Sequence, residues 1–98
     1  MSDERLDATV RGRVQGVGFR YLVVRHAMRL ELTGWVANEP DGSVRCVAEG
    51  PRAALEELLE VLERGPAGAL VERVMTDWEA ATGRFTLFEV RSGGHPGD

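Results

Sequence analysis

The first part of the chain alternates between apolar and polar residues. Its apolar positions are Leu6, Ala8, Val10, Gly12 and Val14. A period of two places alternate side chains on opposite faces of a β-strand. We therefore expect a strand over residues 6–14 with one buried face.

The pattern then changes to a helical period over residues 21–32. Arg25 and Arg29 are four residues apart and share one side of such a helix. The opposite side carries the apolar residues Tyr21, Val24, Ala27 and Met28. The spacing predicts an amphipathic helix that packs through these four side chains.

The remaining elements are separated by glycine and proline. Two short strands, residues 33–38 and 43–49, flank a Pro40 and Gly42 turn and should form a hairpin. Regularly spaced leucines between Gly50-Pro51 and Gly65-Pro66 predict a second helix with an exposed acidic face. Residues 70–79 and 84–91 read as two further strands, with Phe88 and Val90 facing inward in the second.

The order of elements indicates an α+β fold. Strand, helix, strand, strand, helix and strand, with one more strand at the C-terminus, is the order of a ferredoxin-like α/β sandwich, βαββαβ with an addition. Its sheet is mainly antiparallel and is covered on one face by two helices. We expect residues 1–98 to form a single domain, with an ordered core over about 6–91 and a mobile tail at 92–98.

Composition narrows the classes of function. The 98 residues carry a net charge of −4, which argues against general nucleic-acid binding. The sequence has no long apolar run and no signal-peptide pattern, so we expect a cytoplasmic protein that binds no membrane. All twelve basic residues are Arg, so any anion must be held by guanidinium or backbone groups. The lone Cys46 lies in an apolar stretch and is expected to be a buried thiol.

The turn between the first strand and the first helix is a candidate anion site. Gly16 and Gly18 allow neighbouring N–H groups to converge, and the helix N-terminus adds unpaired donors. A cation such as Arg20 is unfavourable in the first helical turn because it lies near the positive end of the helix dipole, and a bound anion would offset this cost. Alternatively, the glycines only make a tight connection and Arg20 extends into solvent.

Asn38 ends the second strand beside a turn, and its amide can both donate and accept hydrogen bonds to a water molecule. With the preceding turn, it completes two long motifs. These are Val10-x-Gly12-x-Val14-Gln15-Gly16-Val17-x-Phe19-Arg20 and Gly34-Trp35-Val36-Ala37-Asn38-x-x-Asp41-Gly42-x-Val44. Together they resemble the two signatures of the acylphosphatase family over roughly residues 6–91. Gly18 occupies a variable position of the first signature.

The resemblance implies a function and a set of site residues. It implies hydrolysis of small acyl phosphates to a carboxylate and inorganic phosphate, with no metal and no cofactor. Arg20 would pair with the substrate phosphate and Asn38 would orient the attacking water. Backbone N–H groups would bind the phosphate, and they belong to Gln15, Gly16, Val17, Gly18 and Phe19.

Other interpretations remain at this point. A non-catalytic ferredoxin-like module that binds or senses an anion would keep the same turn without turnover. An RNA-recognition module is disfavoured by the acidic charge and the lack of paired aromatic residues. His26 and His95 are expected to face solvent, and we expect the protein to be a monomer.

Overall fold

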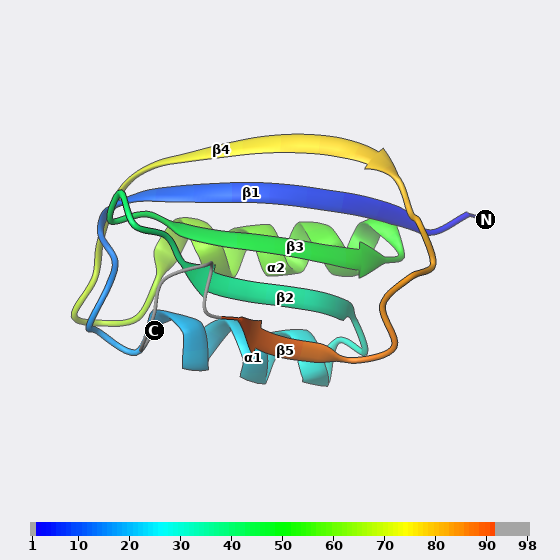
Figure 1. Cartoon of the computed structure of the whole chain (residues 1–98), viewed down its shortest axis with the longest axis horizontal. Helices are drawn as coiled ribbons and strands as arrows, with labels where there is room; N and C mark the ends of the chain where they lie inside the picture. The colour runs from blue at the N-terminus through cyan, green and yellow to red at the C-terminus, as the bar shows by residue number, and fades with distance from the viewer. Residues whose placement is uncertain (1, 92–98) are drawn as a thin grey trace.

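The computed structural model describes residues 2–91, so the tail predicted at 92–98 lies outside the described residues. Five strands form one sheet and two helices cover one of its faces (Figure 1). The elements are β1 (Glu4–Arg13), α1 (Phe19–Arg29), β2 (Thr33–Asn38), β3 (Val44–Gly50), α2 (Arg52–Arg64), β4 (Leu70–Ala80) and β5 (Phe88–Arg91). The predicted ferredoxin-like arrangement with an additional C-terminal strand is confirmed.

The strand order is β4-β1-β3-β2-β5, and every pair is antiparallel except β2 with β5, which is parallel. The predicted hairpin is confirmed by the pairing of β2 with β3. The fifth strand is shorter than the predicted 84–91, because its ladder with β2 begins only at Phe88. Residues 81–87 instead form the connection from β4 at one edge of the sheet to β5 at the other (Figure 1).

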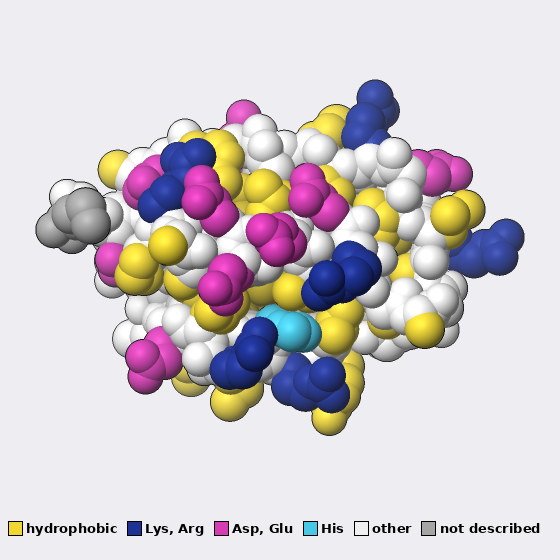
Figure 2. Space-filling view, turned by 180° about the vertical axis from the view of Figure 1, so that it is seen from behind, with side chains coloured by type: hydrophobic (Ala, Val, Ile, Leu, Met, Phe, Trp, Pro, Cys, Tyr) yellow, Lys and Arg dark blue, Asp and Glu magenta, His cyan; other side chains and the backbone are white. Residues whose placement is uncertain are grey.

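The core lies between the sheet and the two helices. Alternate residues of β1 and β3 point into it, as the period of two predicts. The fully buried side chains from these strands are Leu6, Ala8, Val10, Val44, Cys46 and Ala48. Leu55, Leu58 and Leu62 of α2 pack against them, while the acidic side chains of α2 remain exposed on its outer face (Figure 2).

The inward face of α1 matches the prediction only in part, because Ala27 is buried and Val24 packs against the core but Tyr21 and Met28 do not. The helix begins at Phe19, two residues earlier than expected, and it buries Phe19, Val23 and Ala27 at a spacing of four. Tyr21 and Met28 are therefore 70% and 64% exposed. The aromatic ring of Phe19 decides the face, because its burial rotates the following residues outward.

The two tryptophans lie in the sheet, as expected from the sequence. Trp78 of β4 packs against the edge of the core, with the guanidinium of Arg52 3.6 Å from its ring centroid. Trp35 of β2 lies on the uncovered face, within cation–π distance of Arg45 and Arg91.

Candidate active site

Residues 14–18 connect β1 to α1, and we call them the β1–α1 loop. Gly16 and Gly18 both have positive φ, 75° and 83°, which side chains other than glycine adopt only at a cost. A Cβ atom at either position would meet nothing within 4 Å, so the requirement for glycine is conformational and not one of space. Backbones that alternate in this way turn successive N–H groups toward a common point.

The N–H groups of this loop are available to an external acceptor. In the described part of the chain, those of Gly16, Val17 and Gly18 donate no hydrogen bond to another protein group. Gly18 caps α1 without a side-chain acceptor, and no acidic residue lies in the first turn. The positive end of the helix dipole therefore faces the loop without a carboxylate from this turn to compensate it.

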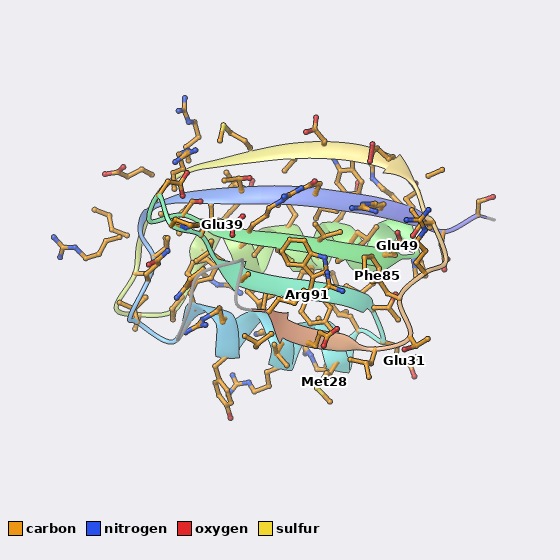
Figure 3. All side chains as sticks on the ribbon, in the orientation of Figure 1. Met28, Glu31, Glu39, Glu49, Phe85 and Arg91 are labelled. Atoms are coloured by element: carbon orange, nitrogen blue, oxygen red, sulfur yellow. The ribbon has the colours of Figure 1, made fainter. Side chains whose placement is uncertain are left out.

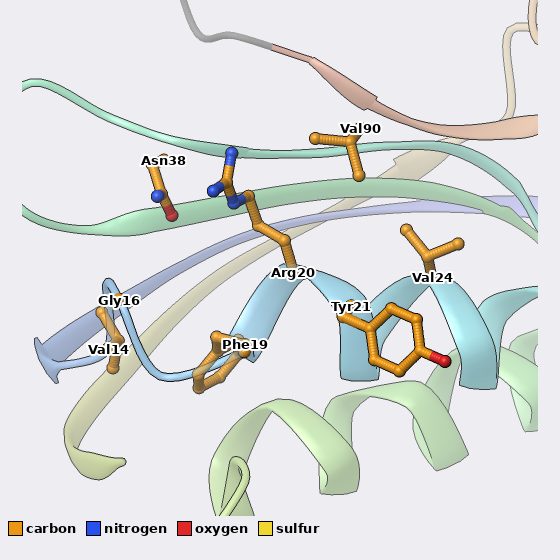
Figure 4. A pocket seen from close by; sticks show the side chains of 9 residues that line it. Val14, Gly16, Phe19, Arg20, Tyr21, Val24, Asn38 and Val90 are labelled. Carbon is orange, nitrogen blue, oxygen red and sulfur yellow. The ribbon is translucent and has the colours of Figure 1, made fainter. Parts of the chain in front are cut away.

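Arg20 is the second residue of α1 and is half-buried. Figure 4 shows its guanidinium above the start of the helix, on the same side as Asn38. A planar guanidinium beside converging N–H groups suits an anion with several acceptor oxygens. The structure thus brings Arg20 to the same pocket as the loop.

Asn38 reaches this pocket because of the register of β2. It pairs with Val44, whose side chain is fully buried under the helices, so Asn38 also points to the helix-covered side. Its Oδ1 atom is buried and accepts no hydrogen bond from the described protein groups. A buried acceptor without a partner is costly, and a water molecule in the pocket would satisfy it.

Gln15 has a role that the sequence did not indicate. Its Nε2 donates to the backbone carbonyls of Glu39 and Ser43, at 2.8 and 2.9 Å. The side chain therefore fastens the β1–α1 loop to the turn that follows Asn38. No local sequence signal could reveal this contact, since its acceptors are backbone atoms 24 and 28 residues away.

The turn after Asn38 is itself held by Asp41. Ser43 donates to Oδ1 of Asp41 from its hydroxyl at 2.6 Å and from its backbone N–H at 3.0 Å. These bonds, with the nearby Arg11 guanidinium, lower the pKa of Asp41 to about 2. The position of Asn38 is thus fixed from both sides, by Asp41 in its own hairpin and by Gln15 from the loop.

These groups line a pocket of about 500 Å³. Gly16, Gly18, Phe19, Arg20 and Asn38 all contribute to its wall. The other two residues predicted for the phosphate site point elsewhere with their side chains. Val17 packs against the core, and Gln15 is bonded to the hairpin as described.

Known proteins with similar sequences and folds identify the family. A model of the acylphosphatase family matches residues 6–90. The acylphosphatase of Salinibacter ruber (strain DSM 13855 / M31) is 53% identical over 90 residues, 92% of this chain and 95% of that protein. This chain belongs to the acylphosphatase family.

Two solved structures agree with the assignment. The crystal structure of acylphosphatase from Bacillus subtilis has a TM-score of 0.86 and 35% identity, and the match covers 90% of this chain and 98% of that one. An acylphosphatase from Coxiella burnetii has a TM-score of 0.81 and 41% identity, over 92% and 94% of the two chains. The activity is that of an acylphosphatase, a hydrolase, as the sequence predicted.

Other titratable groups of this acylphosphatase lie outside the pocket. His26 is half-buried and contacts Arg29 through Nδ1 at 2.9 Å. Burial and the charges of Arg29, Arg25 and Arg64 lower its pKa. Figure 2 shows a cyan histidine side chain next to dark blue basic side chains. His95, which was also expected to face solvent, lies outside the described residues.

Burial raises the pKa of the Cys46 thiol to about 12, so it is a neutral core residue, as expected. Over residues 2–91, no three His, Cys, Asp or Glu side chains are grouped so that they could hold a metal ion. Over the same residues, no helix is both long and apolar enough to cross a membrane.

Proposed function

We propose that the β1–α1 loop and Arg20 bind the phosphoryl group of a small acyl phosphate, and that Asn38 places the attacking water. Backbone N–H groups from Gln15 to Phe19 surround the phosphoryl oxygens, and the Arg20 guanidinium pairs with two of them. The observation that supports this most is the meeting of loop, Arg20 and Asn38 at one pocket. The buried Oδ1 of Asn38, which has no hydrogen-bond partner among the described residues, supports a role in accepting a hydrogen bond from the attacking water.

The chemistry of the substrate explains why so few groups suffice. The bond that breaks joins phosphorus to the oxygen of a carboxylate, whose conjugate acid has a pKa of about 4. Such a leaving group departs without a proton donor. Phosphoryl transfer then needs mainly alignment of water with the leaving oxygen and stabilisation of charge on the phosphoryl oxygens.

Each bond in the step is accounted for by the substrate and water. The water oxygen forms a bond to phosphorus as the bond to the carboxylate oxygen breaks with its electron pair. The water proton passes to an oxygen of the phosphoryl group, so no side chain is required as a base. The products are a carboxylate and inorganic phosphate.

The test is phosphate release from benzoyl phosphate in the presence of a chelator. Wild type should turn over, whereas Arg20→Ala and Asn38→Ala should each lose about 10²–10³-fold or more in kcat/KM, the scale for removing a group that stabilises or aligns the transition state. Arg73→Ala, an exposed arginine on edge strand β4, is the matched control and should keep full activity.

All variants should retain wild-type circular dichroism and a cooperative unfolding transition. Phosphate binding without turnover in wild type would contradict the proposal and favour the non-catalytic module. Full activity in Asn38→Ala would remove that residue from the mechanism. That the protein is a cytoplasmic monomer and binds neither nucleic acid nor membranes stays a prediction from the sequence.

A further inference from the structure

The pocket is larger than the phosphoryl group requires. Its volume of about 500 Å³ falls within the range of roughly 300–1,000 Å³ found for sites that hold drug-sized ligands. The loop, Arg20 and Asn38 occupy only one part of its wall. The remainder is lined by Phe19 at the start of α1 and by the apolar side chains of Tyr21, Val24 and Val90.

Tyr21, Val24 and Val90 form a small apolar surface, here called the apolar rim. Tyr21 is 70% exposed and Val90 is 48% exposed, and both are among the large exposed hydrophobic side chains of the described residues. They come from α1 and β5, which lie side by side (Figure 1). Single exposed apolar residues are ordinary, but a group that lines one pocket beside polar ligand-binding atoms has the composition of a ligand site.

The rim lies on the side of the pocket where the leaving group must go. In phosphoryl transfer the attacking and leaving oxygens are roughly in line through phosphorus. Figure 4 shows Asn38 on one side of the Arg20 guanidinium and Val90, Val24 and Tyr21 on the other. With water held by Asn38, the acyl group therefore extends toward the rim.

We propose that the apolar rim binds the acyl part of the substrate and gives the enzyme a preference for acyl phosphates with a bulky apolar acyl group, aromatic or branched, over acetyl phosphate. This inference rests on the proposed function. The ring of Tyr21 provides the largest contact surface. The Arg25 guanidinium, 5.8 Å from the ring centroid, flanks this ring.

The experiment compares kcat/KM for acetyl, butyryl and benzoyl phosphate. Acetate and butyrate have nearly equal basicity, whereas benzoate is somewhat less basic, so contacts of the acyl group are reported by the butyryl-to-acetyl ratio and by the change of each kcat/KM ratio between wild type and variant. Benzoyl phosphate should exceed acetyl phosphate by about 10-fold or more, within the range for extra apolar groups in a pocket. In Tyr21→Ser and Val90→Ser this ratio should fall several-fold toward one.

Met28→Ser is the matched control, because Met28 is exposed on the same helix and does not line the pocket. Its ratio should equal that of wild type. The inference would be overturned by a benzoyl-to-acetyl kcat/KM ratio near one in wild type, or by a ratio that is unchanged in Tyr21→Ser and Val90→Ser. In either case, hydrolysis of acetyl phosphate would still support the proposed function.

A binding measurement makes the test independent of turnover. Calorimetry with phenylphosphonate and methylphosphonate, two stable compounds that share the anionic head, should show tighter binding of phenylphosphonate by a similar factor. Tyr21→Ser should abolish this difference. If no acyl phosphate is hydrolysed, the proposed function fails, and equal affinities for the two phosphonates would overturn the apolar rim separately.

Discussion

Two connections at opposite ends of the sheet, β4–β5 and β1–α1, each present several backbone N–H groups (Figure 1). They differ in whether a carboxylate of the described protein accepts hydrogen bonds from these groups. In the β4–β5 connection, the N–H groups of Thr82 and Gly83 donate to the carboxylate of Glu49 at 2.9 and 3.0 Å. In the β1–α1 loop, the N–H groups of Gly16 to Gly18 have no acceptor among the described residues, and Arg20 stands beside them.

The difference distinguishes a structural anion site from the proposed ligand site. Glu49 is 4% exposed and belongs to β3, and Figure 3 shows it at the end of the sheet that the β4–β5 connection crosses. Its carboxylate accepts the hydrogen bonds of the β4–β5 connection and so holds this connection to the sheet. At the other end the chain provides a cation and a pocket, and we propose that a substrate supplies the negative charge there.

Of the changes that test this comparison, Glu49→Gln is expected to have the largest effect on the free energy of unfolding. The amide cannot accept the three hydrogen bonds that Glu49 receives from Thr82 and Gly83 without turning its own donors toward them. We expect a loss of about 1–3 kcal/mol in the free energy of unfolding. Denaturant unfolding measures this loss, and kcat/KM per folded molecule should be unchanged.

The effect of Glu49 should also depend on pH. Burial by itself raises the pKa of this carboxyl, but hydrogen bonds from Thr82 and Gly83 and the charge of Arg5 outweigh it and leave the pKa below the ordinary value of 4.5. The resulting stabilisation is complete above the unfolded-state pKa and is lost as the pH falls through the folded-state pKa. The stability gap between wild type and Glu49→Gln should therefore narrow below about pH 4.5, and a gap that widened there would contradict the role of the carboxylate.

A smaller, matched pair of substitutions sharpens the comparison. Gly18 and Gly83 have φ of 83° and 72°, and a Cβ atom at either would meet nothing within 4 Å. Alanine at each should therefore cost a similar amount of stability, about 1 kcal/mol. Only Gly18→Ala should also weaken phosphate binding, since it disturbs N–H groups that face the pocket.

Calorimetric titration with inorganic phosphate checks this pair. Equal loss of phosphate affinity in both variants would show that the β1–α1 loop is not the phosphate site. Equal loss of stability with unchanged affinity in both would lead to the same conclusion.

Much of this site could be predicted from local sequence. The alternation of apolar residues, the helical spacing and the intervening glycines and prolines define the order of elements. Of the candidate residues, Arg20 lies at the start of a helix and Asn38 at the end of a strand. Their meeting follows from the topology, because α1 lies under β2 and Asn38 points to the helix side. The local pattern thus placed both residues at element boundaries, and the resemblance of the two motifs to the acylphosphatase signatures gave them their proposed roles.

The parts that sequence missed depend on contacts between distant segments. The predicted face of α1 was wrong at Tyr21 and Met28, which have the spacing of a buried stripe but are exposed because the helix buries Phe19, Val23 and Ala27 instead. Gln15 and Glu49 carry polar side chains whose partners lie more than 20 residues away, so neither is distinguished by its neighbours in sequence. Val90 faces the helix side as predicted, but its place at the sheet edge leaves it 48% exposed.

The most direct test of the central claim is a titration with inorganic phosphate followed by the ¹H–¹⁵N spectrum of the labelled protein. The amides of Gly16, Val17, Gly18 and Arg20 should shift and saturate together, while those of Thr82 and Gly83 should stay in place because Glu49 already occupies them. Shifts centred instead on the basic residues around His26, or no shift in the β1–α1 loop at saturating phosphate, would contradict the account.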